Sequence, residues 1–209
     1  MAQAGQLGTP PVPCIGPKRV HPFGNAAMHS AAFRVGWQAR QFIDVVKAPV
    51  WRAVWSNVRG RYGADKFPAC DEFLVSSTQV YKYLQNELLA AQNTNHLEDL
   101  CTEELWPVIR ATGADYEKVR RHYSPDECHI VWTSTKAYVC SLGPPEEATA
   151  ADGKFLAGAR FYSVMHMAFA PESVRYSIDD IIFESQWDSE HGIKQWKIAF
   201  IGGPVAPVE

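Results

Sequence analysis

The spacing of apolar residues changes once along this 209-residue chain, and that change constrains the fold more than any other feature. Up to about residue 109, apolar side chains recur every three or four residues, which is the period of an amphipathic helix. From residue 129 onward they alternate and are rich in β-branched and aromatic types, as is typical of strands. Helices followed by a strand meander predict an α+β fold, with helices packed on one face of a curved, cone-like antiparallel sheet.

The helical part is expected to contain four segments. Pro49 separates the first two, because proline removes a backbone hydrogen-bond donor. A further break is expected at residues 102–105, where Thr102-Glu103-Glu104 resembles the start of a new helical turn. The expected helices cover residues 28–47, 50–62, 71–92 and a segment from His96 to Gly113.

The strand part is expected to form a meander closed by a hairpin turn at residues 188–192. In its third strand, strict alternation directs Ile181 and Phe183 toward the core. We expect Asp179, Asp180 and Glu184 on this strand to be solvated edge residues. The expected strands cover residues 129–142, 155–169, 176–187 and 193–201.

Charge divides the chain into two parts. Residues 1–66 carry nine basic and two acidic side chains, a net charge of +7. Residues 67–209 carry 11 basic and 21 acidic side chains, a net charge of −10. We therefore expect an extended tail (proline-rich over 1–25) and a helical arm within residues 1–66, followed by a globular domain over 67–209.

Tryptophan and arginine alternate along the expected arm and give it an amphipathic, cationic surface. An anionic lipid leaflet, an RNA backbone or a protein groove is compatible with such a surface. In the alternative interpretation, the tryptophans pack the core of the domain itself. The residues expected to contact a partner or membrane are Trp37, Arg40, Trp51, Arg52, Trp55, Arg59 and Arg61.

Motifs of catalysis and cofactor binding are absent from the sequence. The five cysteines include no CxxC pair, and the group His122, Cys128 and His129 follows no familiar metal-ligand spacing. There is no glycine-rich nucleotide motif and no nucleophile elbow. His166 in an apolar strand is more simply a hydrogen-bonded core or interface histidine than a base. We therefore expect no enzyme activity, metal, cofactor or small-molecule substrate. The sequence also contains no run of apolar residues long enough to span a membrane.

Two segments resemble the Tim-44-like domain family. The first is Val80-Tyr81-Lys82-Tyr83-Leu84 with the stretch from Asn95 to Leu105, and the second is the closing hairpin with Gln195-Trp196-Lys197-Ile198. The resemblance spans residues 70–202. It implies a cone-like α+β domain similar to nuclear transport factor two, in a family that includes the anchor of the mitochondrial import motor and a mitochondrial large-subunit ribosomal protein. The chain departs from the family at residues 93–95 and in the acidity of its body.

These observations leave four functional hypotheses. The first is a non-catalytic accessory subunit of a mitochondrial inner-membrane assembly, such as the ATP synthase or a respiratory complex, lying peripherally on the matrix side. The second is a mitochondrial large-subunit ribosomal protein, which the −10 body disfavours because RNA contact requires basic side chains. An import or membrane-insertion factor is the third, and a small-molecule enzyme using the cone's interior is the fourth. RNA is expected as a partner only in the ribosomal case, whereas other subunits and anionic lipid suit the first hypothesis.

Overall fold

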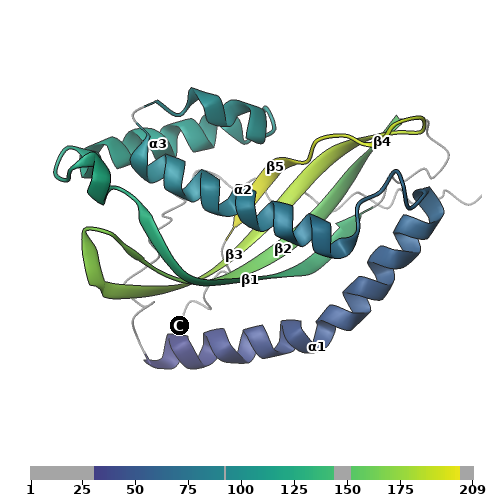
Figure 1. The fold of residues 1–209 in the computed structure, drawn as a ribbon, viewed down its shortest axis with the longest axis horizontal. Helices are drawn as coiled ribbons and strands as arrows, with labels where there is room; N and C mark the ends of the chain where they lie inside the picture. The colour runs from purple at the N-terminus through teal and green to yellow at the C-terminus, as the bar shows by residue number, and fades with distance from the viewer. Residues whose placement is uncertain (1–30, 92, 144–151, 203–209) are drawn as a thin grey trace, which may run out of the picture.

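The computed structural model describes residues 31–91, 93–143 and 152–202, so the expected tail over 1–25 lies outside the described residues. Within these ranges, helices pack on a curled antiparallel sheet, which confirms the predicted α+β class (Figure 1). The main helices are α1 (Ala31–Tyr62), α2 (Cys70–Ala90) and α3 (Trp106–Arg120), with short 3-10 turns η2 (Asn95–Leu100) and η3 (Pro125–Glu127).

The sheet is a meander in which each strand pairs antiparallel with its neighbour. β1 pairs with β2, β2 with β3, and β5 with the other edge of β3, while the two-residue β4 pairs with the end of β3. The expected order of strands is therefore confirmed. The bounds are β1 (Ile130–Gly143), β2 (Asp152–Met167), β3 (Ala170–Asp188), β4 (Gly192–Ile193) and β5 (Lys197–Gly202).

The main core lies between α2 and one face of the sheet. The first half of α1 packs on the opposite face, so the expectation that helices pack on one face only is wrong. Alternate residues of β2 and β3 supply the sheet side, with Phe161 and Phe183 almost fully buried. Tyr81 of α2 stacks on Phe161, with ring centroids 4.5 Å apart. The inward direction predicted for Ile181 and Phe183 is confirmed, because strand periodicity of two leaves no other arrangement once one face is buried.

Two helix boundaries differ from those expected. Residues 31–62 form one helix that contains Pro49 and bends part-way along its length (Figure 1), because both sides of the proline have core contacts that hold them helical. α3 does not end at Gly113 but continues to Arg120. A side chain at position 113 would approach Thr94 to 3.0 Å, so the glycine provides room for packing inside the helix.

The tip of the last hairpin is attached to the segment that follows α1. The backbone N–H of Ile193 donates to the Lys66 carbonyl at 2.9 Å, and Lys66 Nζ donates to the Ser189 carbonyl at 2.7 Å. Gly192 has a φ of +84°, and a Cβ there would lie 2.4 Å from the Lys66 carbonyl oxygen. Only glycine both adopts this positive φ without strain and leaves room for the Lys66 carbonyl.

Candidate functional site: the outward face of α1

The inward face of α1 packs on the chain's own body through tryptophan. Trp37 is 9% exposed, donates from Nε1 to the Ser177 carbonyl at 2.9 Å, and meets Tyr162 edge-on. Trp55 is 1% exposed, donates to the Pro68 carbonyl at 2.9 Å and stacks on an aromatic ring of α2. The expectation that Trp37 and Trp55 contact a partner is therefore corrected, because these side chains are core residues.

The other residues expected to contact a partner have mixed surroundings. Trp51 is half-buried at the edge of the main core. Arg52 forms an ion pair with Asp71 at 2.7 Å, and Arg59 donates to two backbone carbonyls. Arg40 and Arg61 are exposed, and neither pairs with an acid in the described part of the chain. Of the predicted set, Arg40 and Arg61 remain available for a partner.

The opposite, outward face of α1 is apolar and exposed. Its side chains are between 39% and 68% exposed, with Phe42 the most exposed. Most of them recur at intervals of four or seven residues, so they share one side of the helix, turned away from Trp37 and Trp55. We call this set the outer stripe: Val35, Phe42, Ile43, Val45, Val46, Val50 and Val54.

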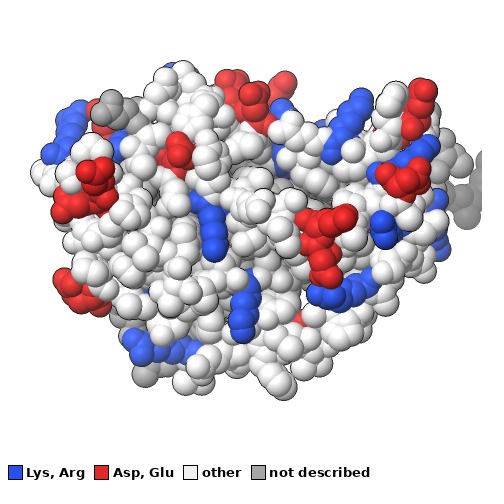
Figure 2. Space-filling view, viewed as in Figure 1, with Lys and Arg blue, Asp and Glu red and all other residues white. Residues whose placement is uncertain are grey.

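Basic side chains border the outer stripe. Arg40 and Lys47 lie two turns apart along one margin, and both are exposed. Arg34 lies along the other margin and stands over the Tyr176 ring at 5.1 Å. In Figure 2, the lower margin of the molecule, where α1 runs in Figure 1, shows white and blue atoms, whereas red atoms gather elsewhere on this face. The site therefore combines an apolar surface with positive margins.

A charge cluster beneath the outer stripe fixes the first half of α1 to the sheet. Asp44, the one acid of α1, turns inward and accepts hydrogen bonds from Arg160 Nη1 at 3.2 Å and Tyr162 Oη at 2.5 Å. Arg160 also binds both carboxylate oxygens of Asp180, at 2.6 and 2.9 Å. The hydrogen bond to Asp180 is the main reason that the pKa of Arg160 is raised, and burial raises the pKa of Tyr162. The cluster holds α1 in the position that directs its stripe outward.

This cluster was not predicted, and the expectation that Asp180 is solvated is wrong. Asp180 lies on the outer face of the sheet, as alternation requires, but α1 covers that face. One signal in the sequence could have indicated it: Asp44 is the single acid among the first 64 residues. A lone carboxylate in a cationic segment indicates a specific partner. Glu184 is paired as well, with Lys154 at 2.8 Å.

A second polar contact lies on the core face, between Tyr81 and Asp179. The phenol donates to the carboxylate at 2.6 Å, and burial raises the pKa of Asp179. The expectation that Asp179 is solvated is therefore also wrong. An acid with a raised pKa beside a phenol could in principle transfer protons. Here Phe161 stacks on Tyr81 and Trp132 packs against its edge, so aromatic rings cover the phenol on two sides.

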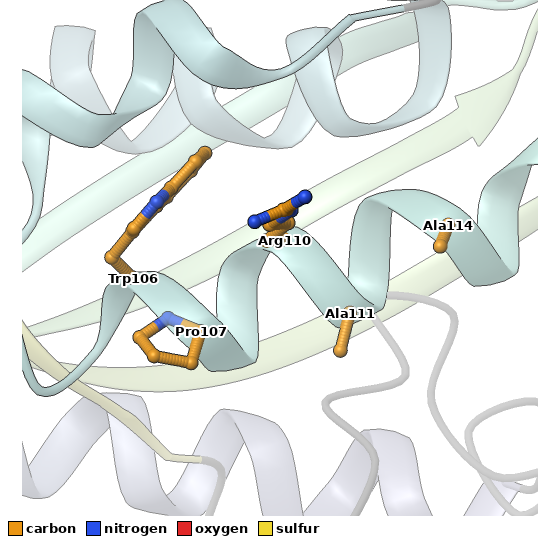
Figure 3. A pocket seen from close by; sticks show the side chains of 5 residues that line it. All are labelled: Trp106, Pro107, Arg110, Ala111 and Ala114. Atoms are coloured by element: carbon orange, nitrogen blue, oxygen red, sulfur yellow. The ribbon is translucent and has the colours of Figure 1, made fainter.

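A hollow of about 380 Å³ lies along α3 (Figure 3). Trp106 and Arg110 point to one side of the helix in that view, and Pro107 and Ala111 point to the other. It offers one cation and an aromatic ring, but neither an acid nor a nucleophile. This composition can hold an apolar or anionic group and does not assemble a catalytic set. Its lining residues are Trp106, Pro107, Arg110, Ala111 and Ala114.

Groups that could bind a metal or react as thiolates do not converge. Among the described residues, no three histidine, cysteine or acidic side chains lie close enough to hold an ion. Burial raises the pKa of Cys101 and of Cys140 to about 11, which keeps both thiols protonated at neutral pH. His166 is half-buried on β2, opposite Val131 of β1. None of the helices in the described ranges has the length and apolar character needed to cross a bilayer.

Comparisons with known proteins assign no family to the chain. No family model matches it, and no curated protein matches it. A solved structure that aligns with it is the intermembrane-space region of the chloroplast protein ARC6, at 13% identity and a TM-score of 0.30. The alignment covers 62% of this chain and 95% of that one. This similarity is too weak to bear on function, and the resemblance to the Tim-44-like family stays a prediction.

Proposed function

We propose that the chain is a non-catalytic accessory subunit of a large mitochondrial inner-membrane assembly, such as the ATP synthase or a respiratory complex. It binds peripherally on the matrix side through α1. The observation that carries the proposal is the outer stripe, an exposed apolar surface on a helix whose other face is already buried. The mitochondrial location rests on the resemblance of residues 80–105 and 182–198 to the Tim-44-like family.

The outer stripe supports assembly because monomeric proteins rarely expose contiguous apolar patches of this kind. Fully burying one large apolar side chain contributes about 1.5–3 kcal/mol. Scaled to exposures of 39% to 68%, the seven side chains would contribute roughly 6–12 kcal/mol on complete burial. The cost of association reduces this figure, yet enough remains for a stable complex once polar contacts are added.

The described polar groups support a structural role rather than catalysis. Asp44, Arg160 and Asp180 bind one another and join α1 to the sheet. Tyr81 and Asp179 join α2 to the sheet beneath a layer of aromatic rings. Each set stabilises a contact between elements, and the outward face of α1 keeps exposed apolar side chains that can bind a partner.

Purification of the tagged full-length chain from its own cells in mild detergent tests the proposal. We expect it to migrate with a large complex at fixed stoichiometry, and Val46→Glu to release it as a monomer. Val75→Glu on α2 is the matched control, since Val75 is 58% exposed and Val46 59%. A wild-type chain that migrates alone, or a Val46→Glu chain that stays in the complex, would overturn the proposal.

A further inference from the structure

We propose that the first half of the outer stripe, from Val35 to Val46, is covered by an α-helix of another subunit, and that this helix carries acidic side chains seven residues apart beside its apolar face. The inference rests on the proposed function and deepens it by naming the chemistry of the partner. Three observations favour a protein helix over a lipid leaflet or a second copy of this chain: the bend of α1, the spacing of its stripe and the charge at its margin.

The bend of α1 disfavours a flat partner. The outer stripe continues across the proline, with Phe42 and Val46 before it and Val50 and Val54 after it. The two halves of the helix run in different directions in Figure 1, and both halves bury their inward faces on the same body. The outward surface is therefore convex, so a planar leaflet can contact only one half at a time, and the proposed partner helix lies on the first half alone.

The spacing of the first half matches the packing of one helix on another. Val35, Ala39, Phe42 and Val46 follow intervals of four, three and four residues, which is the pattern of a coiled-coil seam. Ala39 is exposed at the centre of this seam, and its small side chain lets a partner backbone approach closely. Phe42, next to Ala39 in this seam, is its largest side chain and would pack into the partner helix.

The charge at the margin selects the partner's polar groups. Arg40 and Lys47 are seven residues apart, which separates them by about 10 Å along the helix axis. Both are exposed, and neither forms an ion pair with an acid of the described ranges, because the one acid of the helix, Asp44, binds Arg160 and Tyr162 of the sheet. A parallel or antiparallel partner helix with acids at the same interval would pair with both cations. A second copy of α1 has no such acids and would meet these cations with its own.

Site-specific photo-crosslinking in the native assembly tests the inference. A benzoylphenylalanine residue replaces Phe42 in one chain and Val75 in a control chain, and the crosslinked peptides are sequenced. We expect position 42 to capture one apolar helix that has Asp or Glu at a spacing of seven residues, and position 75 not to capture it.

Charge reversal supplies the second arm. Arg40→Glu with Lys47→Glu should weaken incorporation by on the order of 10- to 30-fold, because each of the two removed ion pairs contributes about 1 kcal/mol. Changing the captured acids to lysine should restore incorporation. Arg110→Glu, on the exposed side of α3, is the control and should leave incorporation unchanged.

The outcomes separate the two proposals. A wild-type chain that joins no complex removes the proposed function and this inference together. A wild-type chain that joins a complex, but crosslinks from position 42 to lipid, to its own copy or to a helix without acids, overturns the inference alone. Thermal melting of each variant reports whether that variant folds. The crosslinking experiment keeps Arg40 and Lys47 intact, so it tests the inference even where the Arg40→Glu, Lys47→Glu variant is unstable.

Discussion

Removal of the Asp44 carboxylate should release the first half of α1 while the rest of the fold persists. Asp44 accepts hydrogen bonds from Arg160 and Tyr162, at 3.2 and 2.5 Å, and hydrogen bonds to a charged group contribute about 1.5–3 kcal/mol each. Arg160 keeps both of its bonds to Asp180, so part of the cluster remains. We therefore expect Asp44→Ala to cost about 2–4 kcal/mol in the docking of this segment.

Hydrogen exchange followed by mass spectrometry measures this release directly. Amides over residues 35–47 should exchange on the order of 30- to 800-fold faster, which is the same free energy expressed as a ratio. Amides of α2 should keep their rates, because Trp55 holds the second half of α1 in the main core. Asp44→Asn keeps an acceptor for Tyr162 and should have a smaller effect.

Two results would contradict this reasoning. Equal acceleration over residues 35–47 and α2 would show that α1 does not open separately from the body. Unchanged exchange over 35–47 would show that the desolvation of the buried charges cancels their attraction, so that the cluster adds no net stability.

Three further changes test the core and the turns. Tyr81→Phe removes the donor to Asp179 and should lower the free energy of unfolding in urea by about 1–3 kcal/mol. Asp179→Asn keeps an acceptor but removes the charge. Because the folded-state pKa of Asp179 is raised, the stability of the wild-type protein falls as pH rises through that pKa. The urea midpoints at mildly acidic and at neutral pH should therefore differ less in the variant than in the wild-type protein. Gly192→Ala should lower the stability of the fold by about 1–3 kcal/mol, because of the strain of a positive φ and the collision with Lys66. Gly60→Ala, at an open position on α1, should raise the stability by about 0.5–1 kcal/mol. Thermal melting compares the two variants.

The fold class and the strand order could be predicted because both follow from local periodicity. Alternation in β3 correctly directed Ile181 and Phe183 to the core, since burial of one sheet face fixes every second residue. The same alternation placed Asp179 on that inner face, but a carboxylate there was interpreted as solvated because its donor, Tyr81, is 98 residues away in sequence. Long-range polar pairs leave no periodic trace in the sequence.

The residues predicted to contact a partner lie on α1, but the tryptophans Trp37 and Trp55 among them lie on its buried face. Tryptophan is the most distinctive residue of α1, and large aromatic side chains suit both a partner surface and a core. Sequence spacing shows which residues share a face, yet it does not show which face the sheet covers. The hydrogen bond from Trp37 to Ser177, 140 residues away, shows that the sheet covers the tryptophan face of α1 and leaves the valine face exposed.

That separation of 140 residues has a consequence for synthesis of the chain. α1 leaves the ribosome long before β2, which provides Arg160 and Tyr162 as partners of Asp44, and β3, which provides the Ser177 carbonyl that binds Trp37. Until β3 is complete, both the core-forming and the outward apolar surfaces of the helix are open to water and to other nascent chains. Domains with such non-local contacts are prone to aggregate while incomplete. A holding chaperone that covers α1 during translation should therefore raise the yield of folded protein more than one supplied after release.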